Sequence, residues 1–408
     1  MITLTNTIYD VIIVGAGASG LAAAISAKRK NKDLKIAILE AQKKAGKKIL
    51  VTGNGRCNLT NTNVNKEFYH GSFDVAPVLK RYSANKLIAY FSALGLVCDT
   101  ESNGLVYPHS RQASAVLDVL LMEIKRLNIE IICECKVELI RKKSGTFNIK
   151  TNNGNYVSKK VVMSCGGKAF PSAGGTGLGL DVIKNLGHKI APVSPALCPI
   201  QVNSCYIKNL KGIRTKAEVT LFDGSKAVKS EVGEVQFTDS ALSGICVFNL
   251  TTLLPKVKSP VISVNLAKDY SNIELLNLLN DRKKLFANEP IENYFTGLFH
   301  KNIGIALLKS VTDKPMTEIC KRLSDKEIKA LANIIQNWKF ECNQCKDFSK
   351  AQVMLGGVNG SEVNNYTFES KIVKNLFICG EALDICGDCG GFNLHFAFAS
   401  GIITGENL

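Results

Sequence analysis

Apolar residues near the start of the chain form two short runs separated by a segment of small residues. Residues 8–14 are mostly apolar and end in Gly15-Ala16-Gly17-Ala18-Ser19-Gly20. Residues 21–27 continue with small and apolar side chains and no helix breaker, and a second apolar run, 35–39, ends at Glu40. A strand that runs into a glycine turn, then a helix and a second strand, is the pattern of a βαβ unit.

The spacing of the glycines in this unit predicts a dinucleotide site. Gly15 suits the tight turn, Gly17 lets the backbone approach a pyrophosphate, and Gly20 lets the helix pack closely on the strand. The first helical turn, with Ala18 and Ser19, directs N–H groups at the negative charge. Glu40 ends the second strand, where a carboxylate accepts hydrogen bonds from a ribose 2′-hydroxyl. A glycine-rich turn of another α/β protein is the alternative, but it leaves Glu40 unexplained.

The second half of the chain has a different pattern. After Ala191, prolines and short alternating segments at 216–222, 227–230, 234–237 and 261–266 predict a small β-barrel. Residues 273–338 have helical apolar spacing, and Ser324 precedes Glu327 in a capping-box arrangement. This stretch reads as a helical insert within the barrel domain.

The middle of the chain predicts three more strands. Residues 129–138, 146–151 and 156–164 have strand-like patterns, with a hairpin turn at 152–155. Val137 in the first of these strands is a further cofactor-binding candidate.

Composition is that of a globular protein of more than one domain. The chain has 408 residues, of which 46% are hydrophobic and 21% charged, which favours two or three domains and argues against extensive disorder. No apolar stretch has the length and continuity of a membrane span. Residues 1–7 lack the features of a signal peptide, so we expect a cytoplasmic protein.

Cysteine usage and charge each raise an alternative. The 14 cysteines include two C-x-x-C pairs, Cys342/Cys345 and Cys386/Cys389. A zinc site or a redox pair is conceivable, but we expect reduced thiols and no metal. The formal charge of +16 invites nucleic-acid binding, but the basic residues are spread in short clusters. We therefore expect a solvated basic surface rather than a nucleic-acid partner.

One segment after Glu40 is specific enough to be compared with a family. Gly46-Lys47-Lys48 followed by Thr52-Gly53-Asn54-Gly55-Arg56-Cys57-Asn58 resembles the signature of the HI0933-like flavoproteins, also called the BaiN/YhiN or "aminoacetone oxidase" family. The family pattern is Gly-Lys-Lys, then Ser/Thr-Gly-x-Gly-Arg-Cys-Asn. Lys47, Lys48 and Arg56 are placed to meet phosphate or the electron-rich edge of a bound ring.

The C-terminal region resembles the same family. Gly380-Glu381-Ala382-Leu383-Asp384 and Gly390-Gly391-Phe392-Asn393-Leu394-His395 are similar to its Gly-Glu-x-Leu-Asp and Gly-Gly-Tyr-Asn-Leu-Gln segments, with Phe392 and His395 as departures. Amides at the start of a helix here would stabilise negative charge on a reduced flavin, and Asp384 could bind the ribityl hydroxyls.

Two further segments resemble the family pattern. Residues 104–111 are similar to Gly-Arg-x-Phe-Pro-x-Ser, which implies Tyr107 and Arg111 near the substrate. An ordinary loop leading into a helix is the alternative. Residues 234–244 match a second segment, except that Asp239 stands where a His is usual. A strand ending in Gly166 and Gly167 is where such flavoproteins return to the cofactor.

The resemblance implies an α/β protein with a Rossmann-like FAD-binding domain of the glutathione-reductase-like type, built from both chain ends. The expected parts are 1–190 and 350–408 for this domain, 191–270 and 337–349 for an inserted β-barrel domain, and 271–336 for its helical insert. The expected FAD-binding residues are Gly15, Gly17, Ala18, Ser19, Gly20, Glu40, Lys47, Lys48, Thr52, Gly53, Gly55, Arg56, Cys57, Asn58, Val137, Gly166, Gly167, Gly380, Glu381, Asp384, Gly390, Gly391, Phe392 and Asn393.

The function that follows is a FAD-dependent oxidoreductase. We expect hydride from NADH or NADPH to reach the flavin and then an activated C=C bond of a small organic molecule, such as a 3-oxo bile-acid intermediate. Tyr107, Arg111 and His395 are candidates for polarising the carbonyl and supplying the proton. A flavin-dependent amine or hydroxy-acid oxidase and a flavoprotein acting on RNA are the alternatives.

Overall fold

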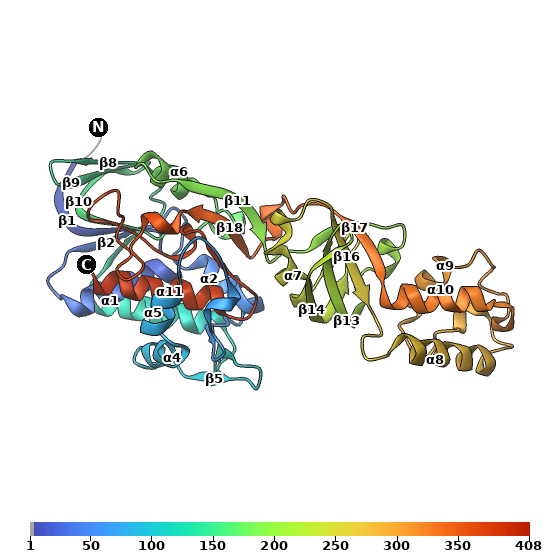
Figure 1. Cartoon of the computed structure of the whole chain (residues 1–408). Helices are drawn as coiled ribbons and strands as arrows, with labels where there is room; N and C mark the ends of the chain where they lie inside the picture. Colours follow the sequence, from blue (N-terminus) through green and yellow to red (C-terminus); the bar gives the residue numbers. More distant parts are fainter. Residues whose placement is uncertain (1–3) are drawn as a thin grey trace. The chain divides into compact units, whose positions relative to one another are not determined.

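The computed structural model describes residues 4–408, with side chains from Ile8 onward (Figure 1). The chain forms two compact units, the first reaching Ala196 and resuming at Lys346–Leu408, the second comprising Leu197–Cys345. The chain passes from one unit to the other a few residues from the expected boundaries at 190 and 350. Strand β11 (Ile190–Ala196) pairs with β18 (Val353–Val358), so pairing holds residues 191–196 in the first unit.

The first unit is built on a sheet whose central strands are parallel. β1 (Leu4–Val14) pairs with β2 (Ile36–Leu39) and β10 (Gly154–Met163), and these pair in turn with β7 (Glu130–Ile132) and β19 (Leu376–Ile378). The carboxyl ends of all five strands therefore meet at one edge of the sheet. Since β19 comes from the C-terminal part, both chain ends build the domain, and the expected Rossmann-like class is confirmed.

One expected strand is two strands. The stretch 129–138 divides into β7 and β8 (Val137–Lys143), and β8 joins the antiparallel β9 (Thr146–Thr151) at the far side of the sheet. Between them the chain leaves the sheet, because the backbone N–H of Cys135 donates to the carbonyl of Glu40 and Glu134 takes a left-handed conformation with φ 54°. This detour brings residues 133–136 beside the end of β2.

Helices α1 (Ala18–Lys30) and α11 (Phe392–Glu406) run parallel, side by side, beneath the sheet in Figure 1. Their backbones approach so closely that a Cβ at Gly401 would lie 2.2 Å from the carbonyl oxygen of Ser19, and one at Gly405 would lie 2.3 Å from that of Ala23. Small residues thus join the first and last helices, and both N-termini point to the same end of the pair.

The remaining elements of the first unit are short, apart from one long helix. They are α2 (Lys47–Val51), β3 (Thr60–Asn61), β4 (Tyr69–Gly71), α3 (Ala76–Arg81), α4 (Ala84–Ser92), β5 (Cys98–Thr100), β6 (Leu105–Pro108), α5 (Ala113–Arg126), α6 (Leu178–Asn185) and β20 (Ile385–Gly387).

The second unit contains a closed barrel of six strands. In barrel order these are β12 (Ile200–Asn203), β15 (Ala241–Ser243), β14 (Lys226–Phe237), β13 (Arg214–Asp223), β16 (Pro260–Asn265) and β17 (Trp338–Cys342). The expected barrel is confirmed, but the separate strands expected at 227–230 and 234–237 are one, β14. β14 pairs with β13 along its length, and this pairing keeps the polar residues between the two expected strands within the sheet.

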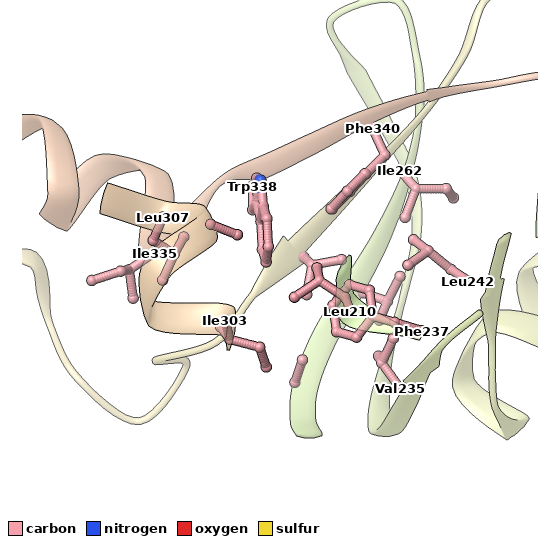
Figure 2. Packing of buried hydrophobic residues seen from close by; sticks show 14 of the residues in the cluster. Leu210, Val235, Phe237, Leu242, Ile262, Ile303, Leu307, Ile335, Trp338 and Phe340 are labelled. Atoms are coloured by element: carbon pink, nitrogen blue, oxygen red, sulfur yellow. The ribbon is translucent and has the colours of Figure 1, made fainter. Parts of the chain in front are cut away.

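Between β16 and β17 the chain forms the helical insert, with α8 (Asn272–Leu285), α9 (Lys301–Lys309) and α10 (Asp325–Gln336); α7 (Ile245–Thr251) packs on the barrel itself. Figure 2 shows that Trp338 lies between the barrel side chains and those of the insert, such as Leu307 and Ile335. Barrel and insert thus share one core. The capping box of Ser324 and Glu327 is present at the start of α10. Within residues 4–408, no helix has the length and apolar character needed to cross a membrane.

Candidate functional site

A cavity opens in the first unit where the parallel strands end. Val14 of β1, Leu39 of β2 and Met163 of β10 form part of its wall, together with the first turns of α1 and α11. It holds about 1480 Å³ of empty space, its open mouth included.

The glycine turn has the geometry that its spacing predicts. Gly15 has φ 103°, and a Cβ there would lie 2.6 Å from the carbonyl oxygen of Ser164. A Cβ at Gly20 would lie 2.0 Å from the carbonyl oxygen of Gly15, whereas one at Gly17 would meet nothing within 4 Å. Two of the glycines are therefore required by the fold, and the third leaves open space at the N-terminus of α1, which suits a pyrophosphate.

Glu40 is held at the end of β2 by backbone N–H groups. Its Oε2 accepts from Ala16 N at 2.7 Å and its Oε1 from Gln42 N at 2.8 Å. The carboxylate thus fixes the glycine turn to the strand end, and each oxygen keeps a lone pair that a ribose hydroxyl can use.

The other end of the cavity is formed by the C-terminal segment. Lys48 Nζ lies 2.6 Å from Glu381 Oε2, and Glu381 Oε1 accepts from Met354 N at 3.1 Å. Asn393, in the first turn of α11, exchanges two hydrogen bonds with the backbone of Gly387, at 2.8 and 2.7 Å. These bonds fix the N-terminus of α11 on the cavity, where its amide dipole favours negative charge.

The expected cofactor residues divide into two sets. Those that line the cavity are Gly15, Gly17, Ala18, Ser19, Glu40, Lys47, Lys48, Thr52, Val137, Gly166, Gly167, Glu381 and Asn393. Those outside its lining are Gly20, Gly53, Gly55, Arg56, Cys57, Asn58, Gly380, Asp384, Gly390, Gly391 and Phe392.

Several residues of the second set support the lining. Asn58 Oδ1 accepts from Val106 N at 3.3 Å, and a Cβ at Gly391 would lie 2.9 Å from the same oxygen. Asp384 Oδ2 accepts from Ser72 N at 3.0 Å. Burial raises the pKa of the Cys57 thiol to about 12, so this side chain is a packed thiol rather than a thiolate.

Tyr107 lies between two guanidinium groups. The guanidinium carbons of Arg56 and Arg111 lie 5.1 and 4.9 Å from the centre of its ring. Arg111 also pairs with Glu101 at 2.6 Å. Burial raises the pKa of Tyr107, and the two arginines oppose that effect. The structure thus brings Tyr107 and Arg111 together, but neither lines the cavity described above.

His395 lies apart from both and does not line the cavity. Its side chain is fully buried in α11, with Nδ1 2.7 Å from Thr60 Oγ1 and Nε2 3.0 Å from the carbonyl oxygen of Tyr82. Burial lowers its pKa to about 4, although the bond to Tyr82 acts in the opposite direction. Both ring nitrogens are engaged in hydrogen bonds within the protein, and the catalytic role expected of His395 stays a prediction.

The cavity also contains residues that were not singled out from the sequence as binding residues. Cys135 and Lys136 line it because the chain leaves the sheet after β7, and Gln352 and Val353 because β18 packs beside Glu381. Gly174, Gly175 and Gly179 also line it, and they belong to a glycine-rich run, 174–179, that is visible in the sequence.

The C-x-x-C pairs show no metal-binding geometry. Among the described residues, no group of three or more His, Cys, Asp and Glu side chains could hold a metal ion. Burial raises the pKa of Cys342 to about 12 and that of Cys386 well above its usual value.

The fold and the cavity define a Rossmann-type dinucleotide-binding protein, with the first turns of two helices in the lining of the binding cavity. More specifically, the chain belongs to the HI0933-like family, since the model of the HI0933-like protein Rossmann domain matches residues 9–407. It is accordingly a FAD-dependent oxidoreductase.

Two curated relatives span almost the whole chain. The 3-dehydro-bile acid delta(4,6)-reductase of Clostridium scindens is 32% identical over 97% of both chains. The ribosomal RNA dihydrouridine synthase of Escherichia coli is 24% identical over 98% of both. Among solved structures, the 3-ketosteroid delta1-dehydrogenase of Sterolibacterium denitrificans is similar in fold, with 11% identity, coverage of 98% of this chain and 99% of that chain, and a TM-score of 0.52.

Proposed function

We propose that this protein reduces a C=C bond conjugated to a carbonyl group, in a small steroid-like molecule such as a 3-oxo bile-acid intermediate, with NADH or NADPH as the electron donor. The observation that carries the proposal is the 32% identity to a reductase of that substrate class over 97% of the chain. The cavity supports it, because the glycine turn, Glu40 and the first turns of α1 and α11 line it and suit FAD.

The residues that line the cavity have distinct proposed roles. The N-terminus of α1 at Gly17 binds the pyrophosphate, and Glu40 accepts hydrogen bonds from the ribose. The N-terminus of α11, fixed by Asn393, stabilises negative charge on the ring system, next to the pair of Lys48 and Glu381. When bound, FAD supplies the hydride acceptor and donor that the reaction needs.

The remaining steps need a polarised carbonyl and a proton for the α-carbon. We assign them to Arg111 and Tyr107, since a guanidinium binds a carbonyl oxygen and a phenol beside two cations is a better acid than an isolated buried one. His395 is not included, because both of its ring nitrogens are already bonded.

The two half-reactions can be tested separately. The FAD-loaded protein is mixed anaerobically with NADH or NADPH, and bleaching of the flavin is followed; a 3-oxo-Δ4 steroid is then added, with the saturated 3-oxo steroid as control. We expect bleaching by at least one nucleotide and reoxidation only by the enone. Absence of bleaching with both nucleotides refutes the donor. Peroxide release from an amine or hydroxy acid without nicotinamide would favour an oxidase.

A matched variant tests the proton donor. Tyr107→Phe should leave the rate of flavin reduction unchanged and slow enone-dependent reoxidation by about 10²-fold or more, since general acid catalysis contributes that much. Tyr366→Phe is the control, because Tyr366 is exposed and lies outside the cavity lining. Equal reoxidation rates in Tyr107→Phe and wild type exclude Tyr107 as the acid.

Reduction of uracil in RNA is a second candidate. The C5=C6 bond of uracil is also conjugated to a carbonyl, and the relative from Escherichia coli is named for dihydrouridine synthesis in ribosomal RNA. The net charge of +16 favours a polyanionic substrate. Reoxidation of the reduced protein by ribosomal RNA, lost as salt is raised, would support this candidate over the steroid.

A further inference from the structure

A second pocket lies in the first unit, at the end of the α1 and α11 pair away from the cavity. We call it the helix-end pocket and define it by Ser26, Arg29, Arg81, Lys86, Tyr90 and Glu406. Helix α1 has 13 residues, so at 1.5 Å per residue its two ends are about 20 Å apart. The pocket is therefore separate from the proposed FAD site.

The helix-end pocket contains two buried hydroxyls that no other group satisfies. Among the described residues, Ser26 Oγ and Tyr90 Oη are the only buried side-chain polar atoms that have no partner apart from each other, and both residues line this one pocket. Even a bond between these two hydroxyls would leave one proton and several lone pairs unpaired. Such atoms are rare in folded proteins, and a bound ion or an ordered water is among the explanations for them.

Cations surround the two hydroxyls. Arg29, Lys30, Arg81 and Lys86 line the pocket against a single lining carboxylate, Glu406, so four positive charges minus one negative leave +3. Arg81 and the Tyr82 hydroxyl bond that carboxylate, and Arg29 bonds Glu123 at 2.7 Å. A guanidinium has five N–H donors, so both arginines keep donors for a ligand.

From this arrangement we propose that the helix-end pocket binds a phosphate group. The remaining N–H donors of Arg29 and Arg81, the ammonium of Lys86 and two hydroxyl donors match the oxygens of a phosphate, a group that guanidinium recognises. The ligand is a phosphomonoester, such as a nucleotide, or a phosphodiester of RNA. The site goes beyond the proposed reduction and does not depend on it.

The test uses the FAD-loaded protein, so that the cavity is filled. Binding of inorganic phosphate, 5′-AMP and a short single-stranded RNA is measured by calorimetry at physiological ionic strength. We expect at least one of the three to bind; tighter binding of 5′-AMP identifies a monoester site, and tighter binding of the RNA a phosphodiester site. If none binds at millimolar concentration, the proposal is wrong.

Two variants distinguish a site formed by specific residues from non-specific attraction to positive charge. Lys86→Gln should weaken binding about tenfold, as loss of a charged hydrogen bond does. Lys80→Gln removes the same charge from an exposed residue outside the lining and should leave affinity unchanged. Equal weakening by both substitutions overturns the proposal.

A third variant tests the hydroxyls directly. Ser26→Ala combined with Tyr90→Phe removes two unsatisfied groups, so the unfolding midpoint should stay the same or rise, while phosphate affinity falls about tenfold. A double variant that binds phosphate as tightly as the wild type overturns the assignment of the hydroxyls to a ligand.

Discussion

Glu40 offers the sharpest test of the proposed adenosine end of the cavity. Its two oxygens accept backbone N–H groups from Ala16 at 2.7 Å and Gln42 at 2.8 Å. In Glu40→Gln, an NH₂ group replaces one of these oxygens and faces a backbone N–H, so two hydrogen-bond donors meet. A hydrogen bond to the backbone is therefore lost, which affects the turn, and the ribose loses its hydrogen bond to an anionic acceptor, which is worth about 1.5–3 kcal/mol of binding free energy.

We expect Glu40→Gln to weaken FAD binding about 10- to 150-fold, by conversion of that free energy. The apoprotein is titrated with FAD, and quenching of flavin fluorescence gives Kd, while urea unfolding of the apoprotein measures the effect on the turn alone. Asp33→Asn, on the exposed link before β2, is the control and should bind FAD normally. A Kd of Glu40→Gln within twofold of wild type would refute this reasoning.

Three further predictions concern stability and packing. Burial would raise the pKa of Glu327, but hydrogen bonds from Lys314, Thr312 and Ser324 outweigh it and lower the pKa to about 2. The ionised carboxylate therefore stabilises the fold above about pH 4.5, and this stabilisation is lost as the pH falls toward 2. With the side chain 14% exposed, Glu327→Gln should reduce the free energy of unfolding by about 2 kcal/mol at pH 7, with a smaller loss at pH 3 in urea titrations. Burial keeps His395 neutral in the fold, with a pKa of about 4, so protonation of the unfolded chain costs stability as the pH falls from 6.5 to 4. His395→Gln should therefore lose less stability between pH 7.5 and pH 5 than the wild type and keep a normal rate of enone-dependent reoxidation; a large loss of that rate would favour a catalytic role. Gly20→Ala places a Cβ 2.0 Å from a backbone oxygen, so the purified protein should lack FAD, seen as a missing visible absorption band; a full flavin content would contradict the close packing of α1.

Part of the site could be predicted because its determinants are local in sequence. The turn from Gly15 to Gly20 combines a positive φ with close backbone approach, and only glycine meets both demands. Lys48 and Glu381 lie far apart in the chain, yet each belongs to a recognisable segment, and the structure joins them in an ion pair.

Other features depended on neighbours that a local pattern does not contain. The apolar stretch 129–138 looks like one strand, but hydrogen bonds from Glu134 and Cys135 to the segment after β2 divide it. The polar residues within β14 look like a break, but pairing with β13 spans them. His395 looked reactive beside a glycine-rich helix start, whereas its environment of Thr60 and Tyr82 is fixed by helix packing.

The sequence by itself determined the βαβ unit, the family and the cofactor class, because glycine turns and strand-end carboxylates act over a few residues. Only the tertiary structure decided how the chain ends combine. The parallel packing of α1 and α11, through Gly401 and Gly405 against backbone oxygens, sets both helix N-termini on one cavity. The same packing brings the basic last turn of α1, with Arg29 and Lys30, beside the acidic Glu406 at the end of α11 in the helix-end pocket.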